Sequence, residues 1–142
     1  MAEGSMTGRR VAVTGATGFV GARLLPSLLA AGADVTAILR TGHEAGELRR
    51  SGVRSVVAHL HDAAAMSRAF AGSDTLINLA YDVRAGGEEN LRAFDGLIAG
   101  ARAAGVGRIV HLSSAVVYRD WPSGPIHESA ALPGDSTATA RG

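Results

Sequence analysis

The sequence predicts one α/β domain built on a doubly wound parallel sheet. Along the 142 residues, five short apolar runs alternate with helical patterns, an order typical of a parallel sheet that carries helices on both faces. The run over 34–39 is continuous rather than alternating, as in parallel strands that are buried on both faces. A chain of this length suits a single domain with its own core.

The individual elements follow from these runs and from the residues between them. The first helix carries a stripe of leucines that continues in phase past Pro26, although a proline inside a helix costs about 3 kcal/mol. Gly32 ends that helix, Asp62 is the N-cap of a later one, and Gly105 caps the last. We expect strands over 10–14, 34–39, 55–58, 75–80 and 108–113, and helices over 19–31, within 41–51, over 63–71 and over 88–104.

The two ends of the chain differ from the domain between them, which is expected over 9–118. Residues 1–8 are small and polar and predict a disordered leader. The tail over 119–142 has no clear apolar period and holds all but one of the 4 prolines, so it predicts an irregular segment.

Composition argues against several classes of protein. A net charge of +1 gives no sign of nucleic-acid or anionic-membrane binding, and no stretch resembles a membrane helix or a signal peptide. The chain has no cysteine, and all 14 basic residues are arginine, which excludes thiolate chemistry and a lysine-dependent phosphate loop. The cytoplasm is the expected location.

The glycine-rich turn after the first strand is the strongest functional signal. Residues 11–21 read VAVTGATGFVG, so that a strand leads into a glycine turn and then into a helix. Such a turn lets bare backbone approach a dinucleotide pyrophosphate, while the helix start offers unpaired N–H groups and the positive end of a dipole. The alternative is a tight turn without a ligand. The expected cofactor contacts are Gly15, Thr17, Gly18, Phe19, Val20 and Gly21.

The G-x-x-G-x-x-G spacing in TGATGFVG resembles the short-chain dehydrogenase/reductase family, in particular its extended branch of nucleotide-sugar epimerases, dehydratases and related reductases. The resemblance reaches from Arg9 to about Pro133. It implies a Rossmann-like sheet in the order 3-2-1-4-5, truncated here after the fifth strand. It also implies a nicotinamide dinucleotide beyond the C-terminal ends of strands 1 and 4.

Arg40 lies 19 positions after Gly21, where a dinucleotide domain places the residue that reads the adenine ribose. An acidic residue there selects NAD, whereas an arginine accepts a 2′-phosphate. NADP is therefore the expected cofactor and NAD the less favoured one. The alternative is a solvated arginine at the end of a strand.

Two further stretches resemble cofactor-contacting segments of the family. Where the family has Gly-Asp-Leu-x-Asp, this chain reads Ala-His-Leu-His-Asp, so His59 replaces the acid near the adenine and the Leu60 backbone remains as a contact. The paired histidines lack a third ligand, and no metal is expected. Leu79, Ala80 and Tyr81 resemble the segment under the ribose and nicotinamide, with simple strand packing as the alternative.

The stretch that ends in Tyr118 resembles the end of the family's fifth strand, where Ser114 falls on the active-site hydroxyl that holds the substrate oxygen. Ordinary turn chemistry is the alternative. The family also uses a tyrosine as proton donor or acceptor, with a lysine four residues later that lowers its pKa. By the family's loop lengths this pair falls on Thr137 and Arg141, and a threonine hydroxyl is too weakly acidic for the role. Ser114 is therefore the expected catalytic residue.

Three interpretations of the function remain open. The first is the NADP(H)-binding half of an epimerase, dehydratase or reductase, completed by a Tyr-x-x-x-Lys helix and a substrate domain and acting on a hydroxyl or carbonyl carbon of a small molecule or nucleotide sugar. The second is a non-catalytic NADP(H)-binding sensor or regulatory module, and the third is a dimerising structural remnant. A homo-oligomer is expected through the helix over 88–104, whose apolar residues are Leu91, Phe94, Leu97, Ile98, Ala101 and Ala104.

Overall fold

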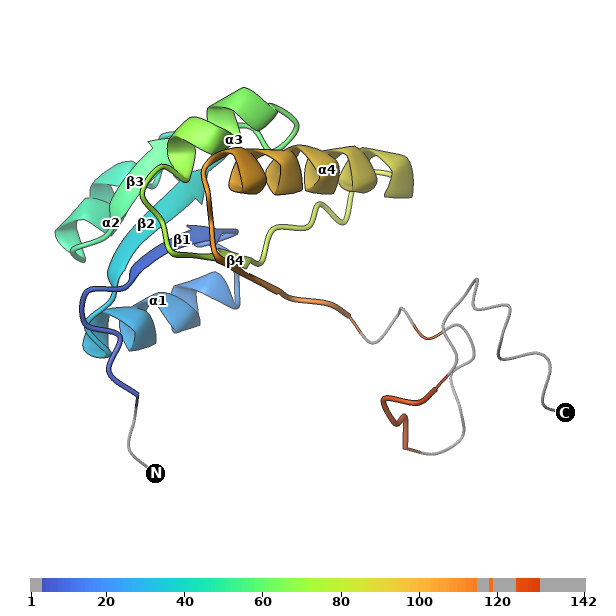
Figure 1. Ribbon diagram of the computed structural model, residues 1–142, viewed down its shortest axis with the longest axis horizontal. Coiled ribbons are helices and arrows are strands. Elements are labelled where there is room, and N and C mark those ends of the chain that lie inside the picture. The colour runs from blue at the N-terminus through green and yellow to red at the C-terminus, as the bar shows by residue number, and fades with distance from the viewer. Residues whose placement is uncertain (1–3, 115–117, 119–124, 131–142) are drawn as a thin grey trace, which may run out of the picture. The chain divides into compact units, whose positions relative to one another are not determined.

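The computed structural model describes residues 4–114, 118 and 125–130 (Figure 1). Its contacts divide the chain into a larger unit, Met1–His111, and a smaller unit, Leu112–Gly142. The larger unit holds a sheet of five strands, all parallel, in the order β3-β2-β1-β4-β5. The predicted fold class and strand order are therefore confirmed.

Strands and helices alternate along the larger unit. The strands are β1 (Arg10–Thr14), β2 (Asp34–Leu39), β3 (Arg54–Val57), β4 (Thr75–Asn78) and β5 (Arg108–His111). The helices are α1 (Gly21–Ala30), α2 (Ala45–Arg50), α3 (Ala63–Ala69) and α4 (Gly87–Ala103). β4 and β5 stop earlier than predicted, and α1 begins only after the glycine turn. Within the described ranges, no helix is both long and apolar enough to cross a membrane.

Two apolar clusters fill the two faces of the sheet. One cluster joins α1 and α2 to the sheet and includes Val11 and Val13 of β1. The other joins α3 and α4 to the opposite face and includes Ala12 of β1 and Leu76 of β4. Figure 1 shows α1 on one side of the strands and the pair α3 and α4 on the other. The central strand β1 therefore supplies alternate residues to both layers, as a doubly wound sheet requires.

Two glycines of α4 make the contact between α3 and α4 possible. A Cβ atom at Gly96 would overlap the carbonyl oxygen of Leu60, and one at Gly100 would lie 2.5 Å from the Cβ of Met66. The start of α3 is fixed by Asp62, whose Oδ1 accepts a hydrogen bond of 2.9 Å from the Ala65 N–H, so the predicted N-cap is confirmed. The backbones on this face are therefore packed too closely for larger side chains.

α4 uses much of its predicted apolar stripe inside the domain. Leu97 and Ala101 are 0% and 1% exposed and belong to the core on the α3 side. Phe94 and Ile98 are half-buried, whereas Leu91 is 60% exposed. The broad surface expected to face a second copy is thus reduced to the part of the helix around Leu91.

Part of the N-terminal leader packs on the domain. The backbone N–H of Met6 donates a hydrogen bond of 2.8 Å to the carbonyl of Ala31, just beyond α1. The Met6 side chain lies against the apolar cluster on the α1 side. This part of the segment predicted as a disordered leader is therefore held by both a main-chain bond and an apolar contact.

Candidate functional site

The carboxyl ends of β1, β2 and β4 meet at one edge of the sheet. The strand register pairs Thr14 of β1 with Ile38 of β2 on one side and with Asn78 of β4 on the other. The glycine turn, Arg40 and the segment over 79–81 therefore leave the sheet side by side. In a doubly wound sheet this edge, where the winding reverses, is the crevice in which ligands bind.

Gly15 brings the glycine turn against the chain beyond β4. Its φ of +68° lies in the left-handed region, and a Cβ atom there would approach the carbonyl carbon of Leu79 to 2.8 Å and the nitrogen of Ala80 to 2.9 Å. Only glycine combines this positive φ with such a close approach of two backbones without strain. Two predicted site segments, the glycine turn and 79–81, are thus brought into direct contact.

Gly18 and Gly21 have different surroundings within the same turn. A Cβ atom at Gly21 would overlap the carbonyl oxygen of Gly15, because the start of α1 packs directly on the turn. At Gly18, which is exposed, the nearest atom to such a Cβ is the Gly15 carbonyl oxygen at 3.3 Å. Gly21 therefore serves packing, whereas Gly18 keeps the outer side of the turn bare.

The start of α1 has no side-chain cap, and the N–H groups of Ala22 and Arg23 donate to the carbonyls of Gly18 and Val20. Val20 occupies the N-cap position with a side chain that cannot accept a hydrogen bond, and the first turn carries no acidic residue. The guanidinium of Arg23 lies 3.8 Å from the centre of the Phe19 ring and donates a hydrogen bond of 3.0 Å to the Phe19 carbonyl. Helix N–H groups, the helix dipole and a nearby cation all favour negative charge at this position.

Arg40 lies at this edge and carries a partner that the sequence did not reveal. Its Nη1 is 3.3 Å from Oδ2 of Asp82, in the loop after β4. The Arg40 side chain is 78% exposed and that of Asp82 is 46% exposed. Exposed pairs of this kind contribute little stability, so the pair costs little to open.

Asp82 is held by its own loop. Its Oδ1 accepts a hydrogen bond of 2.9 Å from the Arg84 N–H, and its main chain exchanges two hydrogen bonds of 3.0 and 2.9 Å with the side chain of Asn90. The Arg84 N–H, with smaller contributions from the Ala85 N–H and the Arg40 charge, lowers the pKa of the Asp82 carboxyl from its ordinary value. Asp82 is therefore ionised at neutral pH.

Two other predicted contacts differ in their surroundings. Tyr81 is 72% exposed beside Asp82 in the chain. Leu60 is half-buried against the core on the α3 side, and its carbonyl faces Gly96 of α4. Nearby, Nε2 of His61 lies 3.0 Å from Oε1 of Glu89. Among the described ranges, no group of three or more His, Asp or Glu side chains could hold a metal ion.

A polar network links three strand ends beneath the site. The hydroxyl of Thr14 and the N–H of Ala80 both donate to Oδ1 of Asn78, whose Nδ2 lies 2.9 Å from Nδ1 of His111. Since Oδ1 accepts two bonds, Nδ2 is the donor, which leaves the proton of a neutral His111 on Nε2. This network was missed as a unit, although the polar residues that end three neighbouring strands in matching register were a usable signal.

Asn78→Ala is expected to lower the free energy of unfolding by about 2 kcal/mol. The substitution leaves the buried Thr14 hydroxyl and the Ala80 N–H without their acceptor, and unsatisfied buried groups cost about 1–3 kcal/mol. Thr75→Ala, at the half-buried start of the same strand, is the matched control and should change stability much less. Equal denaturation midpoints for the two variants in urea would contradict this role of Asn78.

The predicted catalytic residue lies in the smaller unit. Ser114 is exposed and belongs to Leu112–Gly142, as does Tyr118. The two positions at which the family pattern predicts a tyrosine and a lysine, Thr137 and Arg141, lie outside the described residues. The cofactor side of the predicted site is therefore the part for which the structure provides a geometry.

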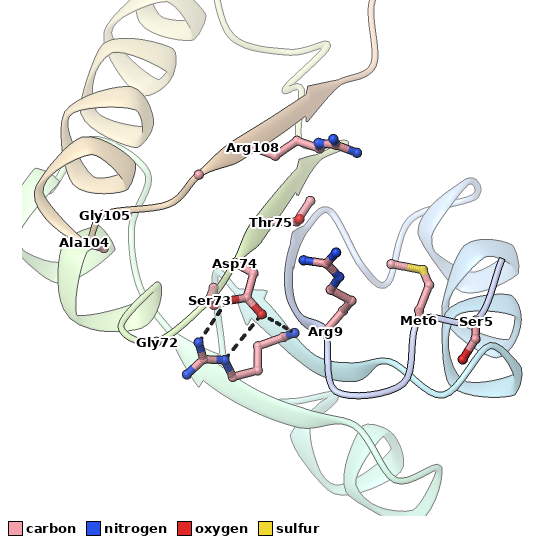
Figure 2. Close-up of a pocket in the computed structure, with 12 residues that line it drawn as sticks. Ser5, Met6, Arg9, Gly72, Ser73, Asp74, Thr75, Ala104, Gly105 and Arg108 are labelled. Atoms are coloured by element: carbon pink, nitrogen blue, oxygen red, sulfur yellow. Dashed lines mark hydrogen bonds and ion pairs between the residues drawn. The ribbon is translucent and has the colours of Figure 1, made fainter.

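Figure 2 shows a separate hollow of about 700 Å³ at the opposite edge of the sheet. It is lined by the residues that begin β1, β4 and β5, among them Arg10, Thr75 and Arg108. Arg10 is bound there to Asp74, with Nη2 2.8 Å from Oδ1. Since none of the predicted site residues lines this hollow, it is distinct from the predicted cofactor site at the carboxyl edge.

Comparison with known proteins shows which family the chain matches. Residues 15–136 match a family described as NAD(P)H-binding. A farnesyl-dihydroquinoline-oxide ketoreductase of Stigmatella aurantiaca is 31% identical over 131 residues, which cover 87% of this chain and 39% of that protein. Sterol demethylase protein B of Methylococcus capsulatus is 33% identical over 123 residues, covering 82% of this chain and 38% of that protein. The chain thus spans about two fifths of the length of these relatives.

Solved structures show the same fold. A nucleoside-diphosphate-sugar epimerase from Pseudomonas aeruginosa is similar with a TM-score of 0.76 at 28% identity, covering 94% of this chain and 44% of that one. An NADPH-dependent quinone oxidoreductase from Escherichia coli, solved with NADPH, is similar with a TM-score of 0.64 at 28% identity, covering 71% of this chain and 35% of that one.

Proposed function

Because the chain belongs to the NAD(P)H-binding family, we propose that its larger unit holds NADP(H) at the carboxyl edge of the sheet, with the pyrophosphate over the glycine turn. The observation that carries this proposal is that the three glycines of the turn have different surroundings. Gly15 packs the turn against the chain beyond β4 and Gly21 packs it against α1, while Gly18 leaves its outer side bare before a helix start with no side-chain cap. Backbone N–H groups of Thr17, Phe19 and Val20 then face the phosphates.

The preference for NADP(H) over NAD(H) rests on Arg40. Its guanidinium is exposed at the end of β2, and a planar, fixed charge with several donors suits a 2′-phosphate. In this proposal Leu79, Ala80 and Tyr81 line the ribose and nicotinamide side, because Gly15 already touches the first two. The Leu60 backbone is the proposed contact to the adenine.

The reaction class we propose is that of a reductase, epimerase or dehydratase, for which this chain supplies the cofactor half. The nicotinamide, when bound, gives or takes a hydride. Ser114 would hold the substrate oxygen by its hydroxyl, and a tyrosine and a lysine from a following helix would move the proton. The substrate is a small molecule or nucleotide sugar with a hydroxyl or carbonyl carbon.

A second candidate is a non-catalytic NADP(H)-binding sensor or regulatory module. It is favoured by one observation: by the family's loop lengths, Thr137 and Arg141 stand where the family has its tyrosine and lysine. Both candidates use the same cofactor site. For either, we propose a cytoplasmic location and a homodimer through α4, supported by Leu91, which is 60% exposed, and by the half-buried Phe94 and Ile98.

Arg40→Asp tests the proposed cofactor. The unmodified chain should bind NADPH more tightly than NADH, and the variant should reverse this order. An acidic side chain accepts a hydrogen bond from the ribose 2′-hydroxyl of NADH and repels the 2′-phosphate of NADPH. Titration followed by the fluorescence of the reduced nicotinamide gives both affinities. Arg49→Asp, on α2, makes the same change of charge at an exposed arginine and should keep the original order. Equal affinities of the unmodified chain for NADPH and NADH would refute the proposal.

A further inference from the structure

The ion pair between Arg40 and Asp82 joins two loops at the carboxyl edge of the sheet, where the cofactor is proposed to bind. Arg40 follows β2 directly and Asp82 follows β4 in the next loop, while β1 and its glycine turn lie between these two strands in the sheet. The pair thus connects the two sides of the edge beyond β1, with 3.3 Å between Nη1 and Oδ2.

Resting on the proposed NADP(H) site, we infer that Asp82 is a specificity-determining residue that competes with the 2′-phosphate for Arg40. The carboxylate and the phosphate are both anions that need the same guanidinium. NADP(H) must displace Asp82 from Arg40 or share the cation with it, whereas NAD(H) has no group at that position. Asp82 therefore moderates the preference that Arg40 creates.

The geometry favours competition over a role in holding Arg40 ready. At 3.3 Å the single contact is longer than the roughly 2.7–2.9 Å of a strong charge-assisted bond. The Arg40 side chain is also 78% exposed, so it can turn to another anion at little cost. A pair that served to fix the guanidinium would be shorter, bidentate or buried.

Asp82 itself cannot easily withdraw when a phosphate arrives. Its Oδ1 is bound to the Arg84 N–H and its main chain to the Asn90 side chain, so the carboxylate stays near the end of Arg40. It then repels a 2′-phosphate even after Arg40 has turned away. The side chain of Arg84, in the same loop, is exposed and reduces this repulsion without removing it.

Asp82→Asn is the central experiment. Asparagine keeps an oxygen that can accept from the Arg84 N–H, so the loop is retained while the charge is lost. The variant should bind NADPH about two- to fivefold more tightly, the range expected for one exposed ion pair, with NADH affinity unchanged. The gain should shrink at high salt, which screens exposed charges.

The control is Glu88→Gln. Glu88 is an exposed acid at the start of α4 that pairs with Arg92 at 3.5 Å, so this variant removes one negative charge near the same loop without touching Arg40. It should change neither affinity. In an Arg40→Ala background no guanidinium is left to compete for, so Asp82→Asn should keep only the smaller NADPH gain that comes from direct repulsion between Asp82 and the 2′-phosphate.

The outcomes separate this inference from the proposed function. Suppose that the unmodified chain prefers NADPH. If Asp82→Asn then weakens NADPH binding, or tightens the binding of NADPH and NADH equally, the inferred competition between Asp82 and the 2′-phosphate is wrong, while the proposed cofactor site stands. If Arg40→Ala keeps the NADPH preference, Arg40 does not read the phosphate. A folded chain that binds neither NADPH nor NADH would overturn both the proposed NADP(H) site and the competition by Asp82.

Discussion

Gly18→Val should abolish dinucleotide binding and leave the domain folded. The bare outer side of the turn at Gly18 is the space proposed for the pyrophosphate, and a branched side chain would fill it and hold the phosphates away from the N–H groups. We expect NADPH affinity to fall at least about a hundredfold, which corresponds to roughly 2.7 kcal/mol. Fluorescence titration measures this loss, and circular dichroism and thermal melting follow the fold.

The position of Gly18 makes this test specific. Its φ lies outside the left-handed region, and the nearest neighbour of an added Cβ is the Gly15 carbonyl oxygen at 3.3 Å, so Gly18→Ala provides a gentler variant should valine disturb the turn. Gly46→Val in α2, where a Cβ would meet open space, is the matched control. Unchanged affinity in a folded Gly18→Val protein would show that the glycines serve the turn alone.

Gly96→Ala should lower the free energy of unfolding by about 2–3 kcal/mol. Alanine is the better helix former, by up to about 1 kcal/mol, but its methyl group would overlap the Leu60 carbonyl and come within 2.9 Å of the His61 carbonyl. These are backbone atoms that cannot rotate away, and overpacking of this kind costs about 1–3 kcal/mol or more. Thermal melting should show a fall of about 10–20 °C in Tm.

Gly87→Ala, at the start of the same helix, is the control for Gly96→Ala. A Cβ at Gly87 would meet no atom within 4 Å, so the methyl group adds helix propensity without a clash. Its stability should therefore stay level or rise slightly. If Gly96→Ala melts together with Gly87→Ala, α4 is free to move away from the loop before α3 and the close packing described above is not required.

The sequence predicted the sheet because each strand is decided by local pattern. β1 and β2 have the expected bounds, since a short apolar run between a helix end and a turn leaves few alternatives. The carboxyl ends of β4 and β5 were placed too late, because apolar residues such as Leu79 and Leu112 continue the pattern beyond the last paired residue. β1 turns away at Gly15, which ends its pairing with β4, and among the described residues β5 pairs only with β4. The end of each strand therefore depends on its neighbour in the sheet, which a local pattern does not show.

The packing of α4 shows where periodicity stops being informative. The helical period correctly groups its apolar residues, but it does not say which of them meet the sheet and which meet α3. That choice is made by Gly96 and Gly100, which let the backbones approach, and a glycine contributes nothing to an apolar stripe. Leu97, expected to widen an exposed surface, is therefore fully buried.

The glycine turn and Arg40 were recognisable as a candidate site, because their spacing from the first strand is short and fixed. Asp82 was not, because its partner Arg40 is 42 positions away and no local rule links a loop after β4 to the end of β2. The resemblance to the extended short-chain dehydrogenase/reductase family is confirmed by the family match over 15–136 and by the epimerase fold.

β5 differs from the other strands in a way that concerns motion. All four of its residues are exposed, whereas every residue of β1 after Arg10 is buried. Hydrogen-bonded segments with little buried surface open locally at lower free energy than the global unfolding of a domain. When β5 opens, Asn78 loses its contact with His111, while its Oδ1 keeps the hydrogen bonds from the Thr14 hydroxyl and the Ala80 N–H. We therefore expect fluctuations of this outer strand to break the His111 contact of the polar network before the bonds that join β1 to β4.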